Sequence, residues 1–232
     1  MNTISPRSDR FLFTLMIAGA ILVAFIGFAP TFYLRTWFGR PALETMVQVH
    51  AVLFSVWLAV LLAQSALIRT RNHAWHARVG ILALAVVALM VITGFMVVLG
   101  KPRLTPGSQS FIFTPLLSLV MFPVLVSLAI RLRRDAATHK RLMWIATLLL
   151  MGAPFTRLLT LLDIAPGRYL HHVLGYLLLL LPLLVHDLWR YRRLHPATLW
   201  GTVALLLRHP LHELIALTPE WRRFAALITA GG

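Results

Sequence analysis

The sequence contains no cysteine, and only 7 of its 232 residues are Asp or Glu. Without cysteine, the chain can form neither a disulfide framework nor a thiolate metal site. It also lacks a Walker motif, a dinucleotide-binding glycine motif and a nucleophile elbow. These absences argue against nucleotide chemistry and against hydrolase chemistry of the soluble type.

Apolar residues dominate the rest of the sequence. Hydrophobic residues make up 59% of the chain, charged residues 12%, and the mean hydropathy is +0.81. A soluble domain averages about 25% charged residues, so this chain needs lipid as its solvent. The apolar runs are continuous rather than alternating, which favours helices over the strands of a barrel. We therefore predict an all-α, polytopic membrane helical bundle.

The length of each apolar run gives the expected spans. A helix needs roughly 20 apolar residues to cross a hydrocarbon core of about 30 Å. Six runs meet this requirement, at residues 11–32, 47–68, 79–100, 111–130, 142–162 and 169–188. Residues 1–193 should form this six-helix transmembrane domain. Residues 194–232 should form an amphipathic tail on the cytoplasmic membrane face, because a tilted seventh span would place Arg208 and Glu213 in lipid.

The basic residues predict orientation. The net charge is +15, and the loops on the side of the N-terminus hold 13 Lys and Arg against 5 on the other side. By the positive-inside rule, both termini should be cytoplasmic, in a bacterial inner membrane. The first apolar run exceeds the core of a cleaved signal peptide, so it is kept as a span. The basic residues lie in short loops, which indicates anionic lipid headgroups as partners and argues against nucleic acid.

Ionisable residues within spans mark candidate sites. His50, His171 and Arg157 should lie at similar depth in the outer third, because each is about 23–27 Å from the inner end of its helix. His76 and His139 form a second level at the inner boundary. Two histidine levels predict two stacked b-type haem centres with His50, His171, His76 and His139 as iron ligands. Arg157 would hold a haem propionate.

Two glycines support the haem interpretation. Gly80 follows His76 by four residues and Gly175 follows His171 by four, so each glycine shares a helix face with its histidine. The missing side chains would leave room for a flat ring. Iron held by two histidines has no open position, which favours electron transfer over oxygen chemistry and leaves open whether the protein is an enzyme.

Other roles for the same residues remain open. His76 and His139 could bind lipid phosphate, while His50 and His171 could form interhelical hydrogen bonds. Arg157 could pair with an acidic loop residue or extend toward the interface. Alternatively, Arg157 and the outer histidines could form a proton or anion site in a small transporter or an assembly factor. A structural subunit of a larger complex is a third hypothesis.

Several motifs together resemble a known family. They are the run at residues 28–34, His50 with Trp57 and Gln64, the HARVG run at 76–80, the HKRLM run at 139–143 with Arg157, and the HPATLWG run at 195–201. In this order they resemble an uncharacterised family of bacterial inner-membrane proteins with a domain-of-unknown-function label. The resemblance covers nearly the whole chain and implies a multi-pass membrane protein without an established activity.

The histidine levels are more loosely similar to the ascorbate-reducible transmembrane cytochrome b proteins. That resemblance implies two haems between four core helices, with His50 paired to His171 and His76 paired to His139. It also implies other membrane redox subunits as partners. The chain departs from the pattern in two ways: the spacing from His50 to His76 is short, and His139 precedes its span.

Overall fold

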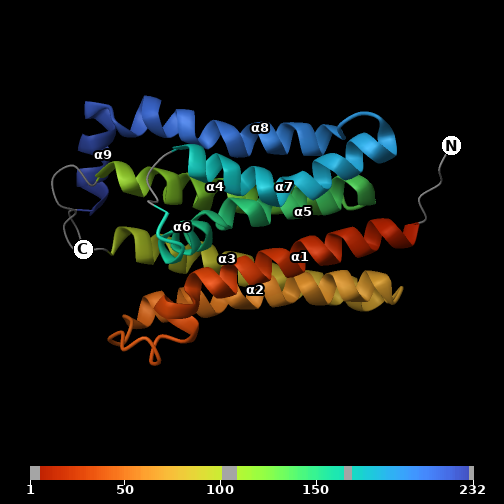
Figure 1. Cartoon of the computed structure of the whole chain (residues 1–232), viewed down its shortest axis with the longest axis horizontal. Coiled ribbons are helices and arrows are strands. Elements are labelled where there is room, and N and C mark those ends of the chain that lie inside the picture. The colour runs from red at the N-terminus through yellow and green to blue at the C-terminus, as the bar shows by residue number, and fades with distance from the viewer. Residues whose placement is uncertain (1–5, 101–108, 165–168, 230–232) are drawn as a thin grey trace. The chain divides into compact units, whose positions relative to one another are not determined.

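The structure, a computed structural model, describes residues 6–100, 109–164 and 169–229. Every regular element in these ranges is a helix, which confirms the all-α part of the predicted fold class (Figure 1). The long apolar runs form helices because a backbone in lipid must satisfy its own polar groups. The described chain folds into two compact units.

The first unit comprises residues 1–90 and 151–194. Its elements are α1 (Pro6–Phe28), the π-helix η1 (Ala29–Tyr33), α2 (Thr45–Arg69), most of α3 (His73–Leu99), α6 (Gly152–Leu161) and α7 (Tyr169–Tyr191). Helix α1 packs against α2, α6 and α7. Small residues bring it close to its neighbours: Ala20 and Ala24 are fully buried, and Gly27 abuts the backbone carbonyl of Pro154 on α6.

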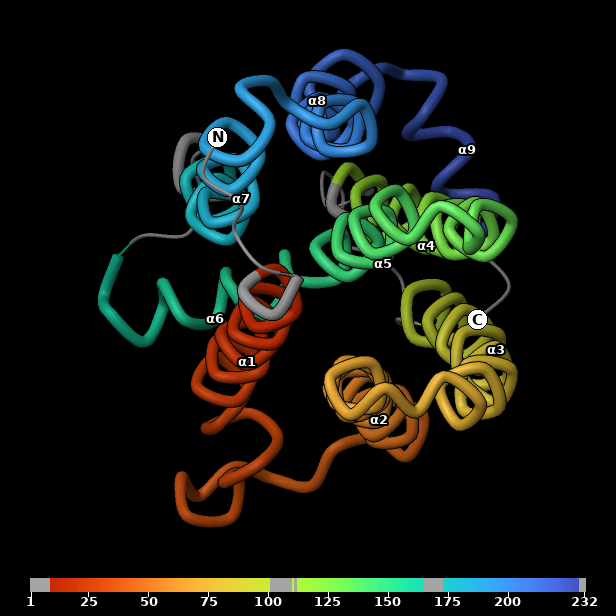
Figure 2. The backbone as a smooth tube through the Cα atoms, turned by 90° about the vertical axis from the view of Figure 1, so that its right-hand side faces the viewer, coloured from red at the N-terminus to blue at the C-terminus, as the bar shows by residue number. Residues whose placement is uncertain are grey.

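The second unit comprises residues 91–150 and 195–232. Its elements are the end of α3, the 3-10 helix η2 (Gln109–Ile112), α4 (Phe113–Arg131), α5 (Ala136–Leu150), α8 (Pro196–Leu211), the π-helix η3 (His212–Ala216) and α9 (Pro219–Thr229). Helix α5 packs against both α4 and α8, as Figure 2 shows. Ile145 and Leu148 are fully buried there, and Ile145 fits against Gly201 of α8.

Among the residues that the structure describes, five single helices are long and apolar enough to cross a membrane. They are α1 extended through η1, α2, α3, α4 and α7, and they correspond to five of the six predicted runs. The run predicted at 142–162 is instead divided at Met151 into α5 and α6, which meet the same criteria only as a pair bent by 50°. Pro154 explains the break, because proline lacks an N–H and its ring clashes with the preceding helical turn.

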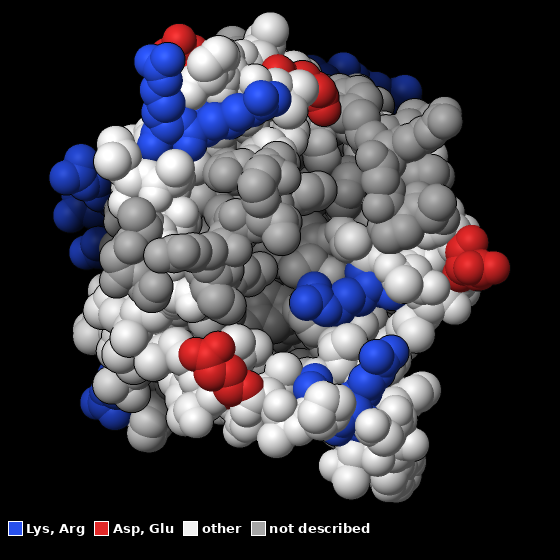
Figure 3. Space-filling view, turned by 90° about the vertical axis from the view of Figure 1, so that its left-hand side faces the viewer, with Lys and Arg blue, Asp and Glu red and all other residues white. Residues whose placement is uncertain are grey.

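The surface agrees with a lipid environment. Large apolar side chains are exposed along the candidate spans, among them Ile81 and Leu82 of α3, each 69% exposed. Figure 3, which looks at the left-hand end of Figure 1, shows Lys, Arg, Asp and Glu side chains at that end of the helices. The apolar surface along the spans would be an aggregation liability in water but is stable in hydrocarbon. The helices therefore make this a membrane protein by length, composition and surface.

Candidate functional site

The outer histidine pair belongs to the first unit. His50 lies half-buried in the second turn of α2. His171 lies near the start of α7, and its side chain is outside the described residues. A shared ligand between these two histidines therefore stays a prediction.

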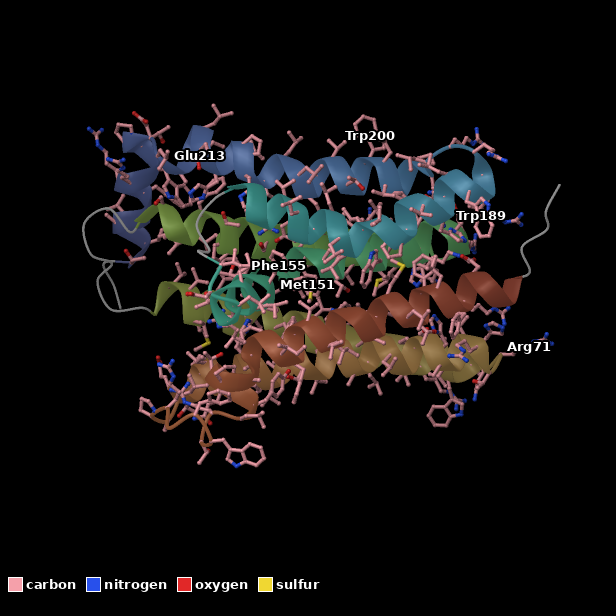
Figure 4. The ribbon with its side chains drawn as sticks, in the orientation of Figure 1. Arg71, Met151, Phe155, Trp189, Trp200 and Glu213 are labelled. Carbon is pink, nitrogen blue, oxygen red and sulfur yellow. The ribbon has the colours of Figure 1, made fainter. Side chains whose placement is uncertain are left out.

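The space beside Gly175 is already filled. A Cβ built on Gly175 would collide with the ring of Phe155 from α6, and one built on Gly152 would lie 2.8 Å from the hydroxyl of Tyr176. Figure 4 shows Phe155 and Met151 where α5 gives way to α6. The space at this place, lined by Met151, Gly152, Phe155, Gly175, Tyr176 and Leu179, has no room even for a water molecule. Gly175 thus makes room for Phe155, and the expectation that it leaves space for a porphyrin is wrong.

The glycine of the inner level is occupied in the same way. A Cβ on Gly80 would lie 3.2 Å from Nε2 of Gln64, which fills the position beside this glycine. Both glycines thus accommodate a neighbouring side chain, and haem binding at the histidines stays a prediction. Gln64, predicted from the sequence as part of a motif, acts here as a space-filling neighbour of α3.

The inner histidines belong to different units. His76 lies half-buried in α3 of the first unit, and His139 lies half-buried in α5 of the second. Nδ1 of His139 is 2.8 Å from the backbone carbonyl oxygen of Ala129 in α4. That hydrogen bond fixes the orientation of the imidazole. The pairing of His76 with His139 stays a prediction.

Arg157 contacts an aromatic ring. Its guanidinium carbon lies 4.8 Å from the ring centroid of Phe28, and Nη1 donates to the carbonyl oxygen of Ala153 at 3.3 Å. A guanidinium over a ring face is a cation–π contact, worth about 0.5–2 kcal/mol. The structure thus gives Arg157 a role in joining α6 to the end of α1. A role toward a propionate stays a prediction.

A buried cluster of ionisable side chains lies elsewhere in the first unit, between α1 and α7. Nε2 of His186 is 3.3 Å from Oδ1 of Asp9, and Nδ1 of His186 is 3.5 Å from Oδ1 of Asp187. Asp187 is 0% exposed and His186 9%. The imidazole of His186 thus lies between two carboxylates. Asp9 comes from the start of the first unit's sequence and Asp187 from near its end.

Polar contacts continue from this cluster along α1 and α2. Nη1 of Arg10 donates to the carbonyl oxygen of Ile68 at 3.3 Å, and the hydroxyls of Thr14 and Ser65 are 2.6 Å apart. The ring of Tyr191 lies 6.1 Å from that of His186. The same ends of α1, α2 and α7 therefore carry the polar groups, while the middle of α1 is lined by alanine and large apolar residues.

Sequence reasoning did not single out this cluster. Asp9 directly precedes Arg10, before the first apolar run, where a charged residue is ordinary. His186 and Asp187 are adjacent near the inner end of an apolar run. This pair is the feature of the sequence that points to a buried contact, because two adjacent ionisable residues in a span need a partner. Asp9 lies at the same end of its span as His186 and Asp187 do of theirs, and this agreement in depth would have suggested that Asp9 contacts the pair.

Within the described ranges, no three His, Asp or Glu side chains lie close enough together to hold a metal ion. Comparison of the chain with protein-family models, with curated proteins and with solved structures gives no match. Function must therefore be argued from the chemistry of the Asp9, His186 and Asp187 side chains, hereafter the acid–histidine cluster.

Proposed function

We propose that this chain is a multi-pass membrane protein of the transporter class that binds and releases a proton at His186. The observation that carries the proposal is the position of the imidazole between Asp9 and Asp187, at 3.3 and 3.5 Å. Imidazole is the side chain that changes charge near neutral pH. Ionisable side chains buried within membrane helices commonly line ion and proton pathways.

The charge of His186 would control the contact between α1 and α7. A protonated imidazole attracts both carboxylates and so joins the two helices. A neutral imidazole loses this attraction, so the contact between Asp9 on α1 and His186 on α7 weakens. Neither ring nitrogen makes a hydrogen bond within the described structure, so the nitrogen that carries no hydrogen in the neutral ring can accept a proton. Protonation would thereby be coupled to helix packing, as transport requires.

The setting we propose is a bacterial inner membrane. Helices α1, α2, α3, α4 and α7, together with the bent pair α5 and α6, would supply six crossings. The ends with the larger number of Lys and Arg would face the cytoplasm. The acid–histidine cluster would then lie near the cytoplasmic face, close to Arg10, where a bound proton can exchange with the cell interior.

A proton-flux measurement tests the proposal. Purified protein is reconstituted in vesicles that contain a pH-sensitive dye, and a potassium diffusion potential is applied. We expect the wild type to acidify the vesicle interior faster than protein-free vesicles, and His186→Gln to lose this excess rate. The exposed His73 at the start of α3 provides the control, because His73→Gln should keep the wild-type rate.

Two outcomes would reject the proposal. One is a wild-type rate equal to that of protein-free vesicles. The other is an undiminished rate in His186→Gln, provided that its melting temperature matches that of the wild type. A fall in rate together with unfolding is resolved by Asp9→Asn, which removes a charge from the partly exposed side of the cluster.

A second candidate is electron transfer through haem b, and one observation favours it. The hydrogen bond of His139 Nδ1 with Ala129 O is the kind of second contact that orients metal-binding histidines. Haem would supply the electron carrier, and His139 would be one of the residues to hold it. The visible spectrum of protein expressed with ample haem decides this: a colourless preparation excludes it, whereas a reducible low-spin spectrum lost in His139→Ala supports it.

A further inference from the structure

Helix α8 and η3 form one uninterrupted helical rod in the second unit. Helix α8 has 16 residues and η3 has 5. The backbone stays helical at His212, the first residue of η3, where the two elements join. Pro210 lies inside α8 without ending it. About 21 residues with a rise of about 1.5 Å each span about 30 Å, which is the thickness of the hydrocarbon core.

The rod runs beside α4, contacts its start and comes near the turn after its end. At one end, His195 caps α8 and lies close enough to Asp135, in the turn after α4, to act on its carboxylate by charge. At the other end, Nδ1 of His212 is 3.1 Å from Oγ1 of Thr114, the second residue of α4. Since α4 is itself long and apolar enough to cross a membrane, a rod that reaches from one end of it to the other covers the same distance.

Contacts along the middle of the rod agree with this course. A Cβ built on Gly201 would lie 2.6 Å from Ile145, so α8 and α5 approach closely. Further along, Arg208 contacts α4 and α5. Ser118 and Leu149 are each about 20 Å from the ends of their helices next to Asp135, and Arg208 is about 18 Å from the start of α8. The three helices are therefore in register over most of their length.

Arg208 is satisfied by protein groups. Its side chain is buried, with the residue 3% exposed. Nη2 donates to Oγ of Ser118 at 2.7 Å and Nη1 to the carbonyl oxygen of Leu149 at 3.4 Å. Intramembrane arginines occur where they face the bundle interior and meet backbone carbonyls. The cost of stranding Arg208 in lipid, which argued against a seventh span, thus does not arise.

The outer face of the rod is apolar. Trp200 is 69% exposed, and Leu199 and Leu207 are also exposed. Figure 4 marks the rod with Trp200 toward its start and Glu213 at its far end. Glu213, the acidic residue that a span has to accommodate, lies in η3, three residues before the end of the rod.

We propose that α8 and η3 cross the membrane beside α4 and α5, and that α9 lies on the opposite membrane face from His195. This inference is independent of the proton site. It replaces the predicted cytoplasmic-face tail with a further span, and it places the C-terminal helix outside the cytoplasm if the basic loops lie within it.

The absence of cysteine allows a direct test. Single cysteines are introduced by Arg193→Cys before α8 and by Glu220→Cys in α9, at positions that are both exposed. Spheroplasts are treated with a membrane-impermeant maleimide, before and after permeabilisation. Labelling after permeabilisation shows that each variant is folded and reactive. Arg134→Cys, in the turn between α4 and α5, marks the side of the His195 end.

We expect one of the two cysteines, at 193 or at 220, to react in intact spheroplasts, and Arg134→Cys to behave like Arg193→Cys. If the basic loops are cytoplasmic, the reactive one is at position 220. If the cysteines at 193 and 220 both react, or are both protected until permeabilisation, α8 and η3 do not cross the membrane and the inference fails.

Discussion

Between Val79 and Leu99, helix α3 has no charged residue, yet most of its side chains are at least partly exposed. Helix α5 contains Lys140 and Arg141, yet it is buried along most of its length, and Arg141 itself is 0% exposed. In water the more apolar helix would be expected inside. In lipid an exposed apolar side chain costs nothing, so burial follows from close packing and polar contacts rather than from hydrophobicity.

Truncating matched isoleucines on the two helices should give the largest difference. Ile145 of α5 is 0% exposed, and Ile81 of α3 is 69% exposed. We expect Ile145→Ala to lower the free energy of unfolding by about 2–5 kcal/mol, because it leaves a cavity against Gly201. Ile81→Ala should change it by less than about 0.5 kcal/mol. Unfolding in detergent micelles measures both, and equal effects would remove the distinction between the helices.

A charge on α3 tests whether its exposed side faces lipid. Leu82→Lys should reduce the membrane-inserted fraction, because a lysine on the lipid-facing side of a span is costly, by up to about 2.5–3.5 kcal/mol at the centre and less toward the end. Leu132, which follows α4 and is 41% exposed, provides the control, and Leu132→Lys should insert normally. Normal insertion of Leu82→Lys would mean that this surface of α3 meets water or protein instead.

Substitutions at two glycines of α1 distinguish the effect of close packing on stability from the effect of helix propensity. Gly27 abuts the carbonyl group of Pro154, a backbone group that cannot rotate away, whereas nothing lies within 4 Å of a Cβ on Gly19. Gly27→Ala should therefore lower stability by about 1–3 kcal/mol. Gly19→Ala should raise it by up to about 1 kcal/mol, because alanine favours the helix. Thermal unfolding of both variants decides, and a stable Gly27→Ala would show that α1 and α6 can separate freely.

The smallest expected effect concerns the start of α5. Asp135 accepts hydrogen bonds from the hydroxyl of Thr138, at 2.5 Å, and from the backbone N–H groups of Ala137 and Thr138. The hydroxyl contact is the main cause that lowers the pKa of Asp135 from its ordinary value of 3.8. Asp135→Ala should cost about 1 kcal/mol at pH 7.

This contribution should depend on pH in a defined direction. Because the folded-state pKa of Asp135 is lowered, the ionised carboxylate stabilises the fold above pH 3.8, and the effect is lost as the pH falls through the lower folded value. The stability difference between the wild type and Asp135→Ala should thus shrink below about pH 4. Glu44 precedes α2 without a side-chain capping bond, so Glu44→Ala should show no such loss. A pH-independent difference for Asp135→Ala would contradict the capping role.

Part of the candidate chemistry was accessible from the sequence. Ionisable residues in apolar runs are rare, so His50, Arg157 and Arg208 could be recognised as residues that need partners. Their partners could not be recognised. Arg157 found an aromatic ring on α1, and Arg208 found a hydroxyl and a carbonyl on two other helices. Such contacts depend on the rotation of each helix about its own axis, which hydropathy does not specify.

The sequence by itself determined that the chain is helical and suited to lipid, because long apolar runs without charge leave the backbone no other way to satisfy its polar groups. It also fixed the approximate bounds of the long helices. Only the tertiary structure decided that the fifth run breaks at Met151, that Phe155 occupies the space beside Gly175, and that His186 meets Asp9. These features arise from side chains far apart in sequence, and their contacts exist only once the helices have packed.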